Sequence, residues 1–172
     1  MKKFGVILAA IAIAIFSSLV AAHCEIPCGI YGDRMRVDQL REHFRTIEKS
    51  MKQVKGLQAQ DEINYNQLIR WVNNKDLHAD KVQKIVYQYF MNQRIKPVED
   101  ADAEGYDKYV KEVTLLHKML VQAMKCKQTT AVGHVENLRK LVDAFAQSYF
   151  EEKAEDEEEA PKKGHGRHGH DH

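Results

Sequence analysis

The stretch VDQLREHFRTIEKSMKQV, residues 37–54, decides the fold class. Its apolar residues recur at alternating steps of three and four, the spacing of one face of an α-helix. They are Val37, Leu40, Phe44, Ile47, Met51 and Val54. The pattern predicts a long amphipathic helix, which Gly56 and the polar residues 58–61 interrupt.

Three further stripes of this kind follow. The second runs through Tyr65, Leu68, Trp71 and Val72, then Val82, Ile85, Val86, Tyr89 and Phe90; the third through Tyr106, Tyr109, Val113, Leu116, Leu120 and Met124; the fourth through Val135, Leu138, Val142, Phe145 and Tyr149. We predict one continuous helix for the second stripe despite Asn73 and Asn74, and Pro97 must end it. Because no segment alternates with period two, the prediction is an all-α, up-down antiparallel four-helix bundle.

The first 22 residues differ from the rest of the chain. Lys2 and Lys3 precede an uncharged run over residues 4–20, and small residues at 20–22 precede a cleavage point. This anatomy is typical of a secretory signal peptide. An uncleaved anchor is the alternative, since the run is at the lower limit for crossing a bilayer. We expect cleavage after Ala22 and export to the periplasm or the extracellular space, where disulfides are permitted.

Charge and length narrow the function classes. The chain of 172 residues fits one domain. It has 26 Lys and Arg against 25 Asp and Glu, and loss of Lys2 and Lys3 leaves 24 against 25. This near-neutral balance gives no sign of a nucleic-acid partner, and no second apolar span would hold the cleaved chain in a membrane.

The C-terminal segment has nothing to bury. Acidic residues dominate 151–159, and four histidines follow among glycines: His165, His168, His170 and His172. The composition predicts a disordered tail whose imidazoles bind Ni(II), Cu(II) or Zn(II). The predicted organisation is therefore a signal peptide over 1–22, a metal hook over 23–33, the bundle over 34–152 and the tail over 153–172.

The new N-terminus carries the chemistry. If the mature chain begins at His23, its free amine, the Cys24 backbone nitrogen and the Cys24 thiolate form successive five-membered chelate rings, and Cys28 supplies a second thiolate. Two nitrogens and two sulfurs in a plane suit Ni(II), and the His23 imidazole is free to approach axially, as Ni(III) would require. Soft thiolates favour the higher oxidation state. The alternative is a Cys24–Cys28 disulfide in an exported helical protein without a metal.

The run HCEIPCGIY, residues 23–31, resembles the N-terminal hook of the nickel superoxide dismutases, whose pattern is H-C-x-x-P-C-G-x-Y. The resemblance continues more weakly in residues 66–71 with Lys75 and His78, and in Tyr89-Phe90 with Arg94, Lys96 and Pro97. It implies a four-helix bundle, assembly as a homohexamer, one nickel ion per subunit and superoxide as the substrate.

Carried over by position, the resemblance makes His23, Cys24 and Cys28 the metal ligands and places Tyr31 over the open face of the metal. Tyr89 becomes a partner behind the ligands, and Asp38 a residue that holds the His23 ring. The expected reaction converts superoxide to oxygen and hydrogen peroxide through a Ni(II)/Ni(III) cycle. An exported nickel or copper metallochaperone is the competing reading; it would release its metal and would need no fixed axial ligand.

The remaining cysteine and histidines carry weaker signals. Cys126 is predicted to be an unpaired structural or surface cysteine, and the only argument for a reactive thiol is that the flanking lysines favour a lower pKa. His43, His78, His117 and His134 fall on separate helices, and each is read as a surface or boundary residue. No glutamate precedes a histidine by three in these helices, so the E-x-x-H mark of a di-iron bundle is missing.

Overall fold

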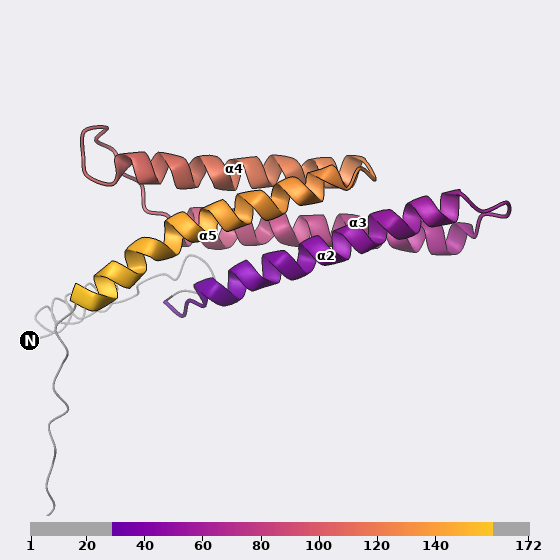
Figure 1. Ribbon diagram of the computed structural model, residues 1–172, viewed down its shortest axis with the longest axis horizontal. Coiled ribbons are helices and arrows are strands. Elements are labelled where there is room, and N and C mark those ends of the chain that lie inside the picture. Colours follow the sequence, from indigo (N-terminus) through magenta and orange to yellow (C-terminus); the bar gives the residue numbers. More distant parts are fainter. Residues whose placement is uncertain (1–28, 160–172) are drawn as a thin grey trace, which may run out of the picture. The chain divides into compact units, whose positions relative to one another are not determined.

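The computed structural model describes residues 29–159, and side chains through residue 151. The four helices are α2 (Asp33–Gln58), α3 (Tyr65–Lys84), α4 (Tyr106–Gln128) and α5 (Gly133–Glu159), and α3 continues without interruption into the π-helix η1 (Ile85–Arg94). They pack antiparallel, α2 against α3, α3 against α4, α4 against α5 and α5 against α2 (Figure 1). The predicted all-α four-helix bundle is confirmed for this part of the chain.

The apolar stripes form the core, as their spacing predicts. Phe44, Phe90 and Phe145 are the largest fully buried side chains, and they come from α2, η1 and α5. Phe90 meets Phe145 edge to face, with ring centroids 4.9 Å apart. Aromatic pairs in this arrangement add to the stabilisation that burial provides.

The predicted continuity of the second helix is also confirmed, because α3 runs through Asn73 and Asn74. Its first half is nevertheless not core: Tyr65 and Ile69 are exposed, and the buried residues of α3 begin at Lys75. The Lys75 ammonium donates to the backbone carbonyls of Cys126 (2.8 Å) and Lys127 (2.5 Å), at the C-terminus of α4. Since α4 ends at this level, the preceding turns of α3 have no α4 surface to pack against.

The fourth helix extends past its apolar stripe. The last stripe residue is Tyr149, whereas α5 is helical to Glu159. Residues 160–172, with the four tail histidines, lie outside the described residues, so the predicted metal-binding tail stays a prediction. Among the described helices, none has the length and apolar character needed to cross a membrane.

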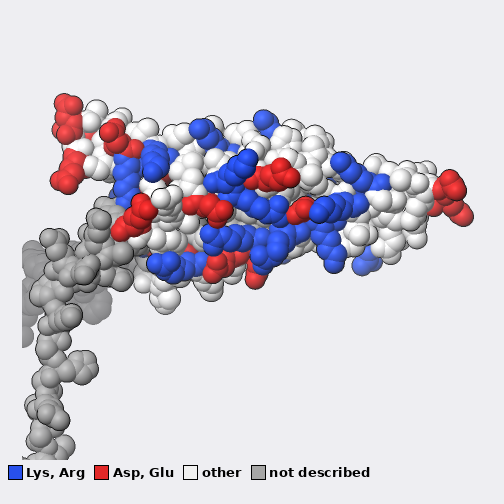
Figure 2. All heavy atoms as spheres, viewed as in Figure 1, with Lys and Arg blue, Asp and Glu red and all other residues white. Residues whose placement is uncertain are grey.

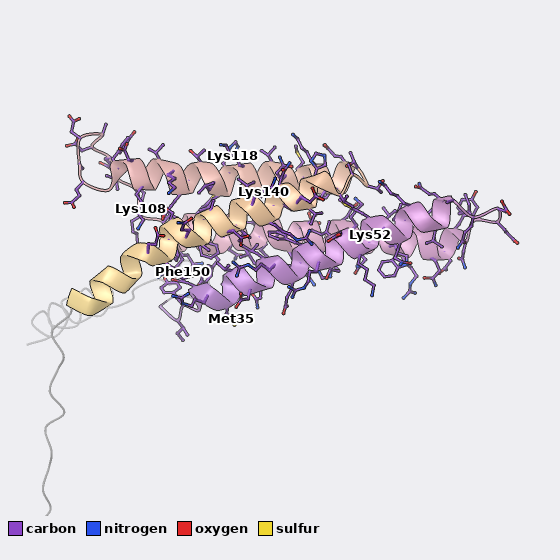
Figure 3. The ribbon with its side chains drawn as sticks, viewed as in Figure 1. Met35, Lys52, Lys108, Lys118, Lys140 and Phe150 are labelled. Atoms are coloured by element: carbon purple, nitrogen blue, oxygen red, sulfur yellow. The ribbon has the colours of Figure 1, made fainter. Side chains whose placement is uncertain are left out.

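Charge is unevenly distributed over the bundle. In Figure 2, Lys and Arg gather on the middle of one face, over α2 and α5, where Figure 3 labels Lys52 and Lys140. Acidic residues gather at the ends, at the turn with Asp61 and Glu62 and at the connection before α4. Acidic side chains are interspersed among these basic ones (Figure 2), and Arg41, Lys52 and Arg139 form ion pairs with Asp143 and Glu48.

Candidate functional site

The predicted metal ligands His23, Cys24 and Cys28 lie outside the described residues. The described chain begins immediately after them, at Gly29, which has φ 79°. Side chains with a Cβ rarely adopt this left-handed conformation, so the residue that follows Cys28 needs to be glycine. Tyr31, predicted to stand over the metal, is exposed.

The first residue of α2 organises a buried polar cluster. The Asp33 carboxylate accepts hydrogen bonds through Oδ1 from the Tyr89 hydroxyl (2.6 Å) and Arg94 Nε (2.9 Å). Through Oδ2 it accepts from Arg94 Nη2 (2.9 Å) and the Tyr149 hydroxyl (2.9 Å). Only 10% of the Asp33 side chain and 19% of the Arg94 side chain are exposed. A bidentate ion pair with Arg94 therefore links the start of α2 to η1, and the hydrogen bond from Tyr149 links it to α5.

The π-helix is what brings Tyr89 and Arg94 to one carboxylate. Around an α-helix, residues i and i+5 lie about 140° apart, so the two side chains would leave on different faces. In η1 the backbone bonds run from i to i+5, as in the bond from Ile95 N to Phe90 O (2.9 Å). Residues five apart then lie closer to the same face of the helix than they would in an α-helix. π-helical turns are rare and occur frequently at functional sites.

Electrostatics fixes the protonation of this cluster. Burial opposes the charge on Arg94, but the hydrogen bonds and charge of Asp33 outweigh it, so the pKa of Arg94 lies above its ordinary value. Burial, with the hydrogen bond to Asp33, raises the pKa of Tyr149 well above that of a free phenol. Tyr149 also stacks on Phe145, with centroids 5.2 Å apart. Its hydroxyl is therefore a fixed hydrogen-bond donor and a poor acid.

A small pocket adjoins the cluster. It encloses about 330 Å³ and shares Arg94 and Tyr149 with it. The rest of its lining is of mixed charge: Lys96, Lys108, Glu104 and Glu112, with Ile95, Val98, Gly105 and Tyr109. Lys108 and Glu112 lie 3.9 Å apart on successive turns of α4 (Figure 3 labels Lys108). The pocket is thus large enough for water or small ions beside the Asp33 cluster.

The two residues predicted behind the ligands differ in their surroundings. Tyr89 is buried and donates to Asp33. Asp38 is 70% exposed on its side chain and pairs with Arg41 at 3.1 Å, one turn along α2, while Arg41 also reaches Asp143 at 2.9 Å. The predicted contact of Asp38 with the His23 ring stays a prediction, because His23 is not described.

Cys126 lies inside the core of the bundle. The thiol is fully buried, and burial raises its pKa to about 11 although Lys75 lies close enough to lower it. It is a free cysteine. The flanking lysines do not activate it, and the structural reading of this residue is confirmed.

Sequence reasoning missed the central residue of the cluster. Asp33 directly follows the hook and opens a helix, and an acidic residue in the first turn has a local explanation in the helix dipole. Arg94 entered only through the family resemblance, and Tyr149 only as a core position. Among the described residues, no three or more His, Cys, Asp or Glu side chains gather where they could hold a metal.

Comparison with known proteins bears on this site. Residues 18–153 match a family model described as nickel-containing superoxide dismutase. The matched range contains the hook run, the Asp33 cluster and the four-helix part. Searches among curated proteins and among solved structures gave no match.

Proposed function

Because the chain belongs to the nickel-containing superoxide dismutase family, we propose that it converts superoxide to oxygen and hydrogen peroxide with one nickel ion per chain. The family match carries this proposal, since it spans both the hook and the bundle. Nickel bound by thiolates supplies one-electron chemistry, in which one superoxide is oxidised and a second is reduced.

The donor set of the hook fits this metal. The amine of His23, the amide nitrogen and thiolate of Cys24 and the thiolate of Cys28 are nitrogen and sulfur donors that would suit nickel, and the His23 imidazole would be an additional nitrogen donor. The amine is free only if the leader is removed after Ala22. We therefore propose that the protein is exported to the periplasm or beyond and that His23 is its first mature residue.

The Asp33 cluster has a positioning role in this proposal. Asp33 is two residues after Tyr31 in the chain, and its carboxylate is held from η1 and from α5 at once. The first residue of α2 therefore has little freedom to move relative to η1 and α5. Tyr89 acts through Asp33 here, by orienting its carboxylate. The approach of superoxide would be controlled by Tyr31.

Two members of this cluster, Tyr149 and Arg94, are poor proton donors for the product peroxide. Tyr149 is held neutral and has a raised pKa, so it releases its proton reluctantly. Arg94 keeps its charge. We propose that the donors are Tyr31, ordered water or a protonated cysteine of the hook.

The test separates the enzyme from a metallochaperone. His23→Gln keeps the amine, the amide and both thiolates, so nickel should stay bound, while superoxide removal measured by pulse radiolysis falls by orders of magnitude. Cys24→Ser and Cys28→Ser should each lose nickel with an unchanged helical circular dichroism spectrum. If the unaltered mature chain binds nickel and removes no superoxide, the chaperone function replaces this one.

Assembly is proposed from the resemblance alone. A homohexamer is expected, and light scattering of the mature chain measures its mass directly. A monomer at micromolar concentration would contradict this part of the proposal without affecting the chemistry of the hook.

A further inference from the structure

Two histidines that are 35 residues apart in the sequence are in contact between the neighbouring helices α2 and α3. His43 lies on α2 and His78 on α3, and their Nδ1 atoms are 3.1 Å apart. The rings meet edge to face, with centroids 5.0 Å apart and planes at 74°. Both side chains are partly exposed, so solvent reaches them. Spacing along either helix gives no sign of this pair, because the antiparallel packing of α2 on α3 creates it.

The separation of the two nitrogens matches that of two neighbouring ligands on one metal ion. A metal–imidazole bond is about 2.0–2.1 Å long, so two nitrogens at the angles of square or tetrahedral coordination lie about 2.8–3.4 Å apart. We propose that His43 and His78 form a second metal site, distinct from the hook, that binds one divalent transition-metal ion of the Ni, Cu or Zn class through both Nδ1 atoms. Water completes the coordination.

The charges around the pair set the character of this site. Burial lowers the pKa of both rings, and the Lys81 charge lowers them further, while Glu42 opposes this for His43. Both imidazoles are therefore neutral at neutral pH, as metal binding requires. The charge of Lys81 also repels a dication, and among the described residues no third His, Cys, Asp or Glu joins the pair. The bound ion is accordingly exchangeable, unlike a structural zinc with four protein ligands.

The metal-free pair and the metal-bound pair differ in where hydrogen resides. Without metal, one Nδ1 carries a hydrogen and donates a hydrogen bond to the other Nδ1, which accepts it. With metal, both Nδ1 lone pairs are engaged, so both rings must carry hydrogen on Nε2. This tautomer change is a direct spectroscopic signature of the site.

The experiment uses the full mature chain with Cys24→Ser and Cys28→Ser, which removes the hook thiolates, and Zn²⁺ as the probe. We expect Zn²⁺ to raise the Tm of this protein, since the ion links two helices of the folded state. His43→Gln and His78→Gln should each abolish the rise, and the double variant should lose no more than either single one. His117→Gln on exposed α4 surface is the matched control and should keep the full rise. Metal bound by a flexible tail also binds the unfolded chain, so it contributes little to the Tm.

A second measurement does not depend on the variants. In ¹⁵N spectra of the histidine rings, Zn²⁺ should shift the signals of both His43 and His78 and convert the ring that donates through Nδ1, so that both rings are Nε2–H tautomers. The proposal is overturned if Zn²⁺ does not raise the Tm of the chain with Cys24→Ser and Cys28→Ser. It is also overturned if the rise is the same in that chain and in all of the histidine variants. The proposal is equally overturned if Zn²⁺ leaves the ¹⁵N signals of His43 and His78 unchanged while it shifts the signals of other histidines. The pair would then be an ordinary hydrogen bond between two neutral rings.

Discussion

Replacing Asp33 with Asn tests the cluster that fixes the start of α2. The substitution keeps the shape of the side chain and removes its charge, which leaves the Arg94 guanidinium, four-fifths buried, without its counter-ion. The amide NH₂ of Asn also replaces one carboxylate oxygen, so it faces hydrogen-bond donors from Arg94 and a tyrosine without being able to accept from them. Breaking a buried ion pair costs about 3–5 kcal/mol, and partial exposure puts this pair at the lower end, about 3 kcal/mol.

For a bundle of this size, a loss of about 3 kcal/mol lowers Tm by roughly 10 °C. Thermal and urea unfolding followed by circular dichroism measure the loss in the mature chain. Asp38→Asn is the matched control, because it removes a helical aspartate from an exposed pair with Arg41, and its cost should stay below about 1 kcal/mol. Equal losses for Asp33→Asn and Asp38→Asn would refute the reasoning. So would additive losses in the double variant Asp33→Asn with Arg94→Gln, since a contacting pair must show coupling.

Three further outcomes follow from other contacts of the bundle. Lys75→Met should cost about 2 kcal/mol in urea unfolding, because the carbonyls at the end of α4 lose a charged donor; a loss below 0.5 kcal/mol, on the order of a surface change, would contradict this. In the folded chain Cys126, with its pKa near 11, should resist a thiol reagent at pH 8 and react fully in urea; rapid native labelling would show that its burial is not maintained. The pKa values of His43 and His78 are lower in the folded than in the unfolded state, so the unfolded chain binds more protons below the unfolded pKa of about 6.5. Stability is then complete above pH 7 and falls on acidification through 6.5, and the double Gln variant should show a shallower fall of Tm; an unchanged slope would mean that the pair does not titrate on unfolding.

The sequence predicts the four helices well because each is long and carries a stripe at steps of three and four. Its predictions weaken where packing decides the outcome. Tyr65 belongs to the second stripe but stays exposed, since α4 ends beside Lys75 and cannot cover it. The stripe that ends at Tyr149 likewise gives no measure of how far α5 continues.

The site was harder to predict than the fold for physical reasons. The hook was predicted from local chain chemistry, because an amine, an amide and two thiols lie within six residues, and it stays a prediction because these residues are not described. The partners of Asp33 come from positions 56 to 116 residues away, so only tertiary structure brings them together. A prediction based on 3.6 residues per turn also places the side chains of Tyr89 and Arg94 on different faces of the helix. The wider turns of η1 bring the two side chains to the same carboxylate.

A π-helix of this kind can accommodate a one-residue insertion in an α-helix and keep a pair of side chains on one side. One residue added to an α-helix rotates everything after it by about 100°, which would carry Arg94 away from Tyr89. Bonding from i to i+5 absorbs the added residue and cancels this rotation. A relative with one residue fewer between these positions would then form the same pair on an ordinary α-helix, at spacing i,i+4. Aligned relatives should therefore show a single-residue gap inside Ile85–Arg94, and the length of this segment, as much as its composition, specifies the cluster.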